Sequence, residues 1–197
     1  KSYKETLKFL LARLVYNDAL ITIFAFGGIY AKQVFDFTFN EIFLFGIVLN
    51  VTAGIGALTM GFLDDILGGK KTIQISNVGF IIACTLAVFA PDFNNGRFIF
   101  WIAGSMIGIF SGPNQAASRS LMGRMTPKNK ESQFYGFFAF SGKATSFVGP
   151  LLFSTIVSLT DSIRLGLAIV SILFLIGIIL LNNVNEEQGI KDANAIT

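Results

Sequence analysis

Apolar residues along this chain gather into six long blocks that are separated by short polar stretches. Each block is long enough to cross a hydrocarbon layer about 30 Å thick, which takes about 20 helical residues. The blocks are continuous and do not alternate apolar with polar positions, so they favour helices over a β-barrel. The pattern predicts an all-α membrane protein with a bundle over 9–181, whose helices span 9–30, 41–63, 72–90, 98–118, 133–159 and 164–181.

Polar segments flank this predicted bundle. Residues 1–8 are polar and basic and lack the apolar core of a signal peptide, so we interpret them as the end of a cytoplasmic linker. Residues 182–197 form a polar tail with Glu186, Glu187 and Lys191, which we expect to be cytoplasmic and mobile. Six transmembrane helices with both ends on one side make half of a twelve-helix transporter. We therefore expect an amino-terminal six-helix half as a partner, or a second copy of the chain if the polypeptide is this half alone.

The composition agrees with a chain that lies in a lipid bilayer. Hydrophobic residues make up 53% of the 197 residues and charged residues only 14%, which is unusual for a soluble domain of this size. The basic residues lie in predicted loops and not in a folded basic patch, so no nucleic-acid partner is expected. Their bias to one side predicts that both ends of this multi-pass protein face the cytoplasm. We expect its location to be the bacterial inner membrane. The cytoplasmic set is Lys1, Lys4, Lys8, Arg13, Lys70, Lys71, Arg119, Arg124, Lys128, Lys130 and Lys191, against Lys32, Arg97 and Arg164 outside.

Several classes of chemistry lack the residues they need. The chain has no histidine and a single cysteine, Cys84, so it offers neither a disulfide framework nor a His/Cys metal site. A Gly-rich phosphate loop is missing as well, which argues against ATP-driven transport. Adjacent carboxylates at Asp64 and Asp65 beside lysines are too small a set for a metal site. We expect no enzyme activity and no cofactor, although an intramembrane enzyme and a non-transporting membrane scaffold or receptor stay open as alternatives.

One charged residue lies deep within a predicted span. Lys143 is about 15 Å along its helix from Gln133, close to the bilayer midplane. An unpaired charge there costs about 2.5 to 3.5 kcal/mol, so a partner is expected. Asp18 lies at a similar depth, about 14 Å from Phe9 in the first span. We predict an Asp18–Lys143 pair in which Asp18 carries a coupling proton and Lys143 binds an anionic solute group or exchanges partners during transport. Two alternatives stay open: the pair only fixes the helix register, or the two residues make no direct contact.

Other polar residues at depth complete a candidate cavity. Asn17 adjoins Asp18, Asn50 lies in the middle of the second span, and Asn114 and Gln115 lie near the end of the fourth. Amides can bind a zwitterionic solute, but they also join helices within membranes.

Glycine and proline mark positions where helices can bend or approach each other. Gly112-Pro113 and Gly149-Pro150 are candidate hinges, because proline removes a backbone donor and glycine lowers the cost of bending. Gly54, Ala57 and Gly61 share one face of the second span and predict close helix packing.

The loop after the second span, GFLDDILGGKKT, resembles the signature that major facilitator superfamily transporters carry between helices 2 and 3 and again between helices 8 and 9. It departs from the signature at Ile66, which stands in place of a basic residue, and at Gly69, which displaces the lysines by one position. The resemblance implies a conformational gating loop, whereas a solvated turn would have the same composition. The matching residues are Gly61, Leu63, Asp65, Gly68, Lys70 and Lys71.

Two longer stretches resemble the vacuole effluxer-like branch of that superfamily. They are FLLARLVYNDALITIFAFGGIYA over 9–31 and GPNQAASRSLMGRMTPKNKESQFYGFFAFSGKATSFVGPLLF over 112–153. The resemblance covers 8–181 and implies that the six spans are helices 7 to 12 of a twelve-helix major facilitator fold. It implies secondary active transport of a small-molecule solute by alternating access, with eukaryotic relatives linked to amino-acid efflux.

Overall fold

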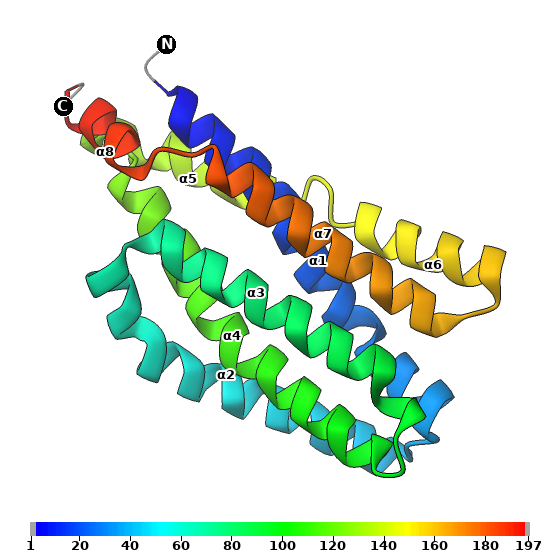
Figure 1. Ribbon diagram of the computed structural model, residues 1–197. Coiled ribbons are helices and arrows are strands. Elements are labelled where there is room, and N and C mark those ends of the chain that lie inside the picture. The colour runs from blue at the N-terminus through cyan, green and yellow to red at the C-terminus, as the bar shows by residue number, and fades with distance from the viewer. Residues whose placement is uncertain (1–2, 196–197) are drawn as a thin grey trace.

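The computed structural model describes residues 3–195, and all regular structure in this part of the chain is helical. The helices form one elongated bundle, and both ends of the chain lie at the same end of it (Figure 1), here called the terminal end. The elements are α1 (Lys4–Phe35), α2 (Phe39–Leu67), α3 (Gly69–Phe89), η1 (Ala90–Asp92), α4 (Gly96–Arg124), η2 (Lys128–Lys130), α5 (Glu131–Ser141), α6 (Val148–Thr160), α7 (Ile163–Asn182) and α8 (Glu186–Asn194).

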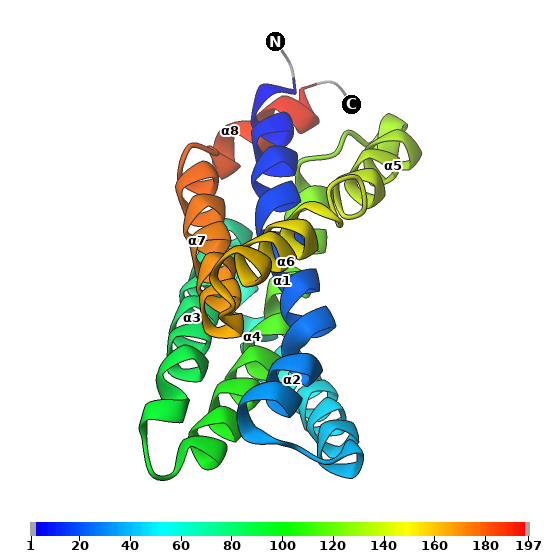
Figure 2. The same ribbon diagram turned by 90° about the vertical axis from the view of Figure 1, so that its right-hand side faces the viewer.

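Two of the long helices, α4 and α7, each pack against two others. α4 lies against both α2 and α3, and α7 lies against α1 and α3. The consecutive helices α5 and α6 cross α1 obliquely (Figure 2), and α6 also packs on α7. Within the described residues, α1, α2, α3 with η1, and α7 are long and apolar enough to cross a membrane, and α6 is a shorter apolar helix. At 29 residues α4 is about 43 Å long, enough to cross as well, although it carries Asn114, Gln115 and Arg119.

The span predicted as one helix over 133–159 is in fact two helices. α5 ends at Ser141 and α6 begins at Val148, so the prediction of an unbroken helix here is wrong. Pro150 explains where α6 begins, because a residue without a backbone N–H is tolerated in the first turn of a helix and not in its interior. The break places Lys143 in a turn between the two helices.

Both flanking segments also differ from the expectation. α1 already begins at Lys4, so most of the expected linker over 1–8 is helical. The expected mobile tail contains α8, in which Gly189 and Ala193 are buried. Asn185 caps this helix by accepting a hydrogen bond from the backbone N–H of Gln188.

A carboxylate of α8 fastens it to the terminal end of the bundle. The two oxygens of Glu186 accept from the backbone N–H groups of Gly69 and Lys70, at 3.1 and 3.0 Å, in the first turn of α3. A negative charge is favourable there because the first N–H groups of a helix have no partner within it. Arg124 joins the same cluster, with Nη2 2.7 Å from Asp64 Oδ1 and 3.4 Å from Glu186 Oε1.

Replacing Glu186 by glutamine should loosen α8. The amide cannot accept with both terminal atoms and lacks the charge that favours the helix terminus, so we expect a loss of about 1 kcal/mol in the free energy of unfolding. Limited proteolysis should cut 183–195 faster in this variant. Glu187→Gln is the matched control, because Glu187 is an exposed neighbour on the same helix. Equal proteolysis of both variants would contradict the assigned cap.

The α2–α4 contact is made by small residues other than those predicted. A Cβ atom added to Gly56 would overlap the backbone of Ile109, and one added to Gly112 would lie 2.8 Å from the backbone nitrogen of Ala57. By contrast, nothing lies within 4 Å of a Cβ added to Gly54 or Gly61. The predicted face of Gly54, Ala57 and Gly61 is therefore wrong for its two glycines, and the close face passes through Gly56.

Candidate functional site

Three polar side chains on one side of α1 reach the break between α5 and α6. Arg13 and Asn17 are four residues apart and share one face of α1, and Asp18 lies about 100° further round the helix. All three are buried. Each of them bonds a backbone group of the broken helix, and together they are called the α1 clamp.

Arg13 holds the end of α5. Its Nη1 donates to the carbonyl oxygen of Phe138 at 2.7 Å and to Ser141 Oγ at 2.9 Å, and its guanidinium lies 3.6 Å from the centre of the Phe138 ring. The last carbonyl groups of a helix carry partial negative charge, which a cation stabilises. The ring face adds a further attraction for the guanidinium. The prediction that Arg13 is a cytoplasmic loop charge is therefore wrong.

Asn17 and Asp18 bond the other groups of the break. Asn17 Nδ2 donates to the carbonyl oxygen of Gly142 at 3.0 Å. Asp18 Oδ2 accepts from the backbone N–H of Gly149 at 2.7 Å, in the first turn of α6. A carboxylate at a helix N-terminus is stabilised by the helix dipole and by the unpaired N–H groups. The clamp thus places a cation at the end of α5 and an anion at the start of α6.

Glycine allows both close approaches. A Cβ added to Gly142 would lie 2.9 Å from Arg13 Nη1, and one added to Gly149 would overlap Thr22 Oγ1. The predicted hinge glycine Gly149 therefore has a steric role here, with Pro150 beside it in the first turn of α6.

The second oxygen of Asp18 stands out within the described part of the chain. Asp18 is only 4% exposed, and its Oδ1 is buried without a hydrogen-bond partner. Burying an unpaired carboxylate oxygen is costly, and most buried polar atoms are bonded. An ionisable residue inside a membrane bundle is rare for the same reason, which makes Asp18 the first candidate for a functional group.

Lys143 is not the partner of Asp18. No ion pair joins them in the described structure, and Lys143 is exposed in the turn between α5 and α6. The predicted direct pair assumed one continuous helix, which would have carried Lys143 past Asp18 at the same depth. The break turns the lysine away, and a backbone N–H takes its place.

The other predicted amides do not converge on Asp18. Asn114 is buried and donates to Asn77 Oδ1 at 3.1 Å, so it joins α4 to α3. Asn50 is exposed and donates to the carbonyl oxygen of Gly46 in its own helix. Gln115 is exposed.

Some residues of the predicted gating loop and of the predicted hinge in α4 are bonded or buried, and others are exposed. Gly68 is the only residue between α2 and α3 and has φ +86°, a conformation that favours glycine. Lys70 Nζ donates to the carbonyl oxygens of Asn182 and Val184, at 2.9 and 2.7 Å, whereas Asp65 and Lys71 are exposed. Pro113 is buried inside an unbroken α4.

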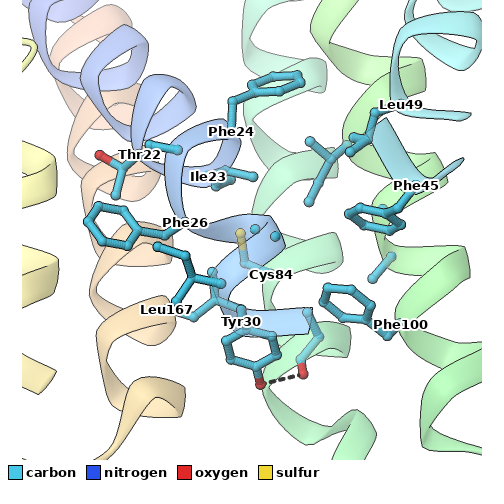
Figure 3. A pocket seen from close by; sticks show the side chains of 18 of the residues that line it. Thr22, Ile23, Phe24, Phe26, Tyr30, Phe45, Leu49, Cys84, Phe100 and Leu167 are labelled. Atoms are coloured by element: carbon cyan, nitrogen blue, oxygen red, sulfur yellow. Dashed lines mark hydrogen bonds between the residues drawn. The ribbon is translucent and has the colours of Figure 1, made fainter. Parts of the chain in front are cut away.

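A cavity of about 530 Å³ lies beside the clamp, between α1, α2, α3, α4 and α7. Its wall is mainly apolar and aromatic (Figure 3), with Phe26 and Leu167 facing Phe45 and Phe100 across it and Cys84 between them. Tyr30 closes one part of the wall by donating to the carbonyl oxygen of Ala87 at 2.9 Å. Asn50 is the one predicted site residue that lines it, together with Thr22 and with Phe153 from α6.

The sequence interpretation missed Arg13 and the aromatic wall. The i, i+4 spacing of Arg13 and Asn17 within an apolar span, next to Asp18, was a usable signal for the clamp. The wall had no comparable signal, because Phe26, Phe45 and Phe100 come from three separate spans.

Comparisons with known proteins give a consistent assignment. The chain is 29% identical over 189 residues to an uncharacterized MFS-type transporter, YxiO, of Bacillus subtilis, with 96% of this chain and 43% of that protein covered. It is 25% identical over 205 residues to autophagy-related protein 22 of Kluyveromyces lactis, with 98% and 41% covered. The chain thus spans less than half the length of either relative.

Structure and family agree with these relatives. The fold resembles the inward-open xylose transporter XylE of E. coli with a TM-score of 0.79 and 16% identity, over all of this chain and 53% of that one. The predicted fold class, an all-α membrane protein with half of a major facilitator fold, is confirmed. The family model described as "Vacuole effluxer Atg22 like" matches residues 1–194, and the chain belongs to this family.

Proposed function

We propose that the protein is a secondary active transporter that moves a small-molecule solute across a membrane by alternating access. The single observation that carries this proposal is Asp18, a buried carboxylate with one unpaired oxygen beside a helix break and an apolar cavity. Intramembrane carboxylates of this kind serve proton and ion pathways. The transporter relatives support the same class of function.

Within this function we assign Asp18 as the group that carries a coupling proton. Its Oδ1 has no hydrogen-bond partner and can take up a proton, and its Oδ2 accepts from the Gly149 N–H. Lys143 is exposed at the break, and we assign it to an anionic group of the solute. Asn17, Asn50, Asn114 and Gln115 remain candidates for lining the path, and Gly112 and Pro113 for a hinge in α4.

The solute class we propose is amino acids moving in the efflux direction, in keeping with the vacuole effluxer description of the family. The charged ends of an amino acid suit a lysine and a set of amides. An amino-terminal six-helix half would enclose the other side of the path. We place the protein in the bacterial inner membrane with both ends in the cytoplasm.

The test is uptake and efflux of labelled amino acids by the full-length protein in proteoliposomes, with and without an imposed pH gradient. Asp18→Asn should abolish the response to the pH gradient, because an amide cannot take up and release the coupling proton. Lys143→Ala should raise the solute concentration needed for half-maximal transport. Asp161→Asn and Lys128→Ala are matched controls, since both residues are exposed and lie far along the chain from the break.

Normal transport and normal gradient response in folded Asp18→Asn and Lys143→Ala would contradict both assignments. A well-folded parent protein that moves neither amino acids nor other small solutes would contradict the transporter proposal itself. It would favour a membrane scaffold or receptor instead.

A further inference from the structure

The two sides of the α1 clamp differ in whether they can change charge. Arg13 is a permanent cation in proteins, so the end of α5 is always held. Asp18 is a carboxylate, which can gain a proton and become neutral. The attachment of α6 therefore rests on a group that can be switched, while the attachment of α5 does not.

The start of α6 leads directly to the wall of the cavity. Phe153 lies four residues after Gly149, one helical turn along α6. It is 3% exposed, lines the cavity and stacks on Phe26 with ring centres 4.2 Å apart. Thr22 lines the same cavity and lies against Gly149. A displacement of the first turn of α6 would consequently move an aromatic side chain of the wall.

Few residues of α6 are buried in the described part of the chain, and its packing is confined to one side. Leu151, Leu152 and Leu159 are exposed on its outer side, and Gly149 and Phe153 are its buried residues. Its main neighbour is α7, where Gly166 lies against Val157. Helical segments with few buried contacts open most readily.

We propose that α6 is a movable wall of the apolar cavity, held closed by the charged carboxylate of Asp18 and released when Asp18 takes up a proton. Protonation removes the charge that strengthens the bond to the Gly149 N–H and that favours the helix N-terminus. Arg13 is a positioning residue in this device, because it keeps α5 fixed while α6 moves. The inference rests on the proposed transport function and deepens it by giving the proton a structural effect.

The charged surroundings leave Asp18 as the group that titrates at this contact. α6 carries no titratable side chain. On α7 only Arg164, at the start of that helix, is charged, and it bonds Asp92 of η1. Within α1, the neighbouring titratable groups are already bonded, Arg13 to α5 and Tyr16 to Ser118 Oγ. The remaining groups on the elements around the clamp are Lys143 in the turn, Glu131 and Tyr135 on α5, and Arg97, Arg119 and Arg124 on α4.

Cys84 supplies a reporter inside the cavity. Its side chain is fully buried and lines the wall, so its alkylation by N-ethylmaleimide measures how open the cavity is. The full-length protein in membranes is labelled between pH 5 and pH 9, without solute, and modification of the Cys84 peptide is quantified by mass spectrometry. Dividing the rate in the parent protein by the rate in Asp18→Asn at each pH cancels the pH dependence of thiol chemistry.

We expect Asp18→Asn to label about tenfold faster than the parent at high pH, where the parent carboxylate is charged, a shift equivalent to about 1.4 kcal/mol. The ratio should approach one at low pH, where the parent is neutral as well. Asp161→Asn, at the far end of α6, should match the parent at every pH. A ratio of one throughout, or a constant ratio that ignores pH, would overturn the proposal.

A second comparison covers the case in which Asp18→Asn does not fold. Phe153→Ala removes the proposed wall, so its Cys84 should label fast at all pH values, and the parent should approach it only as the pH falls. If the ratio of the Cys84 labelling rates in the parent protein and in Phe153→Ala is the same at every pH, the proposal that α6 is a movable wall is contradicted. The labelling experiment does not measure transport, so its result is separate from the transport assay. Proton-coupled transport with labelling that does not change with pH would contradict only the movable wall. Labelling that changes with pH in a protein that transports nothing would contradict only the transport proposal.

Discussion

Replacing Gly56 by alanine is expected to destabilise the bundle by about 3 kcal/mol, at the upper end of what overpacking causes. The added Cβ would overlap the carbonyl oxygen of Ile109 and lie 2.7 Å from its carbonyl carbon and 2.9 Å from its Cα. Backbone atoms cannot rotate away as a side chain can, so α2 and α4 would have to separate. Helices in lipid associate through such close contacts, so separating α2 from α4 also weakens the packing of the other residues between these two helices.

Unfolding in mixed micelles of mild detergent and sodium dodecyl sulfate gives the measurement. Gly54→Ala is the matched control, since it lies on the same helix with open space around its Cβ position. That variant should be neutral or up to about 1 kcal/mol more stable, because alanine is the better helix former. Comparable losses in the two variants would show that the α2–α4 contact does not pass through Gly56.

Replacing Arg13 by alanine should cost about 2 to 3 kcal/mol. The change removes charged hydrogen bonds to Phe138 and Ser141 and the contact with the Phe138 ring. The loss is partly offset, since the variant no longer buries a cation without a carboxylate partner. Arg13→Lys keeps the charge but lacks the planar guanidinium, so its free energy of unfolding should lie between those of the parent protein and Arg13→Ala.

The same micelle titration measures this effect. Arg119→Ala is the matched control, because it removes an exposed arginine from α4. A stability of Arg13→Ala equal to that of Arg119→Ala would mean that the end of α5 needs no cation. Full recovery in Arg13→Lys would mean that charge alone suffices.

The helical class and the approximate positions of the spans were readable from the sequence, because lipid demands long apolar blocks. The break at 142–147 was not, since Gly142 to Phe147 are as apolar or small as their neighbours and only Lys143 interrupts them. Hydropathy measures composition and does not report where backbone bonds end. Pro150 was noted as a bend, whereas in the structure it lies in the first turn of a new helix.

The candidate site was predicted in part. Asp18 was identified from its depth alone, but its predicted contact was another side chain, and the actual one is a backbone N–H. Backbone donors at helix ends are invisible to a search for charge pairs, because every residue except proline has one. Arg13 lies inside the first predicted span, yet the charge pattern grouped it with the cytoplasmic loop residues. In the structure it lies in the interior of α1 and bonds the end of α5.

The position of α8 has a consequence for how the chain is made. Its partners are the start of α3 through Glu186, the end of α4 through Arg124 and the start of α1 through Glu5, whose Oε2 accepts from the Asn185 N–H at 2.7 Å. Ribosomes synthesise α8 after all of these, and domains generally form as the chain emerges. α8 can dock only when three earlier helices have reached their final places relative to one another. Its docking thus acts as a late check on assembly, and a misinserted helix would leave the carboxylate of Glu186 without its amide partners.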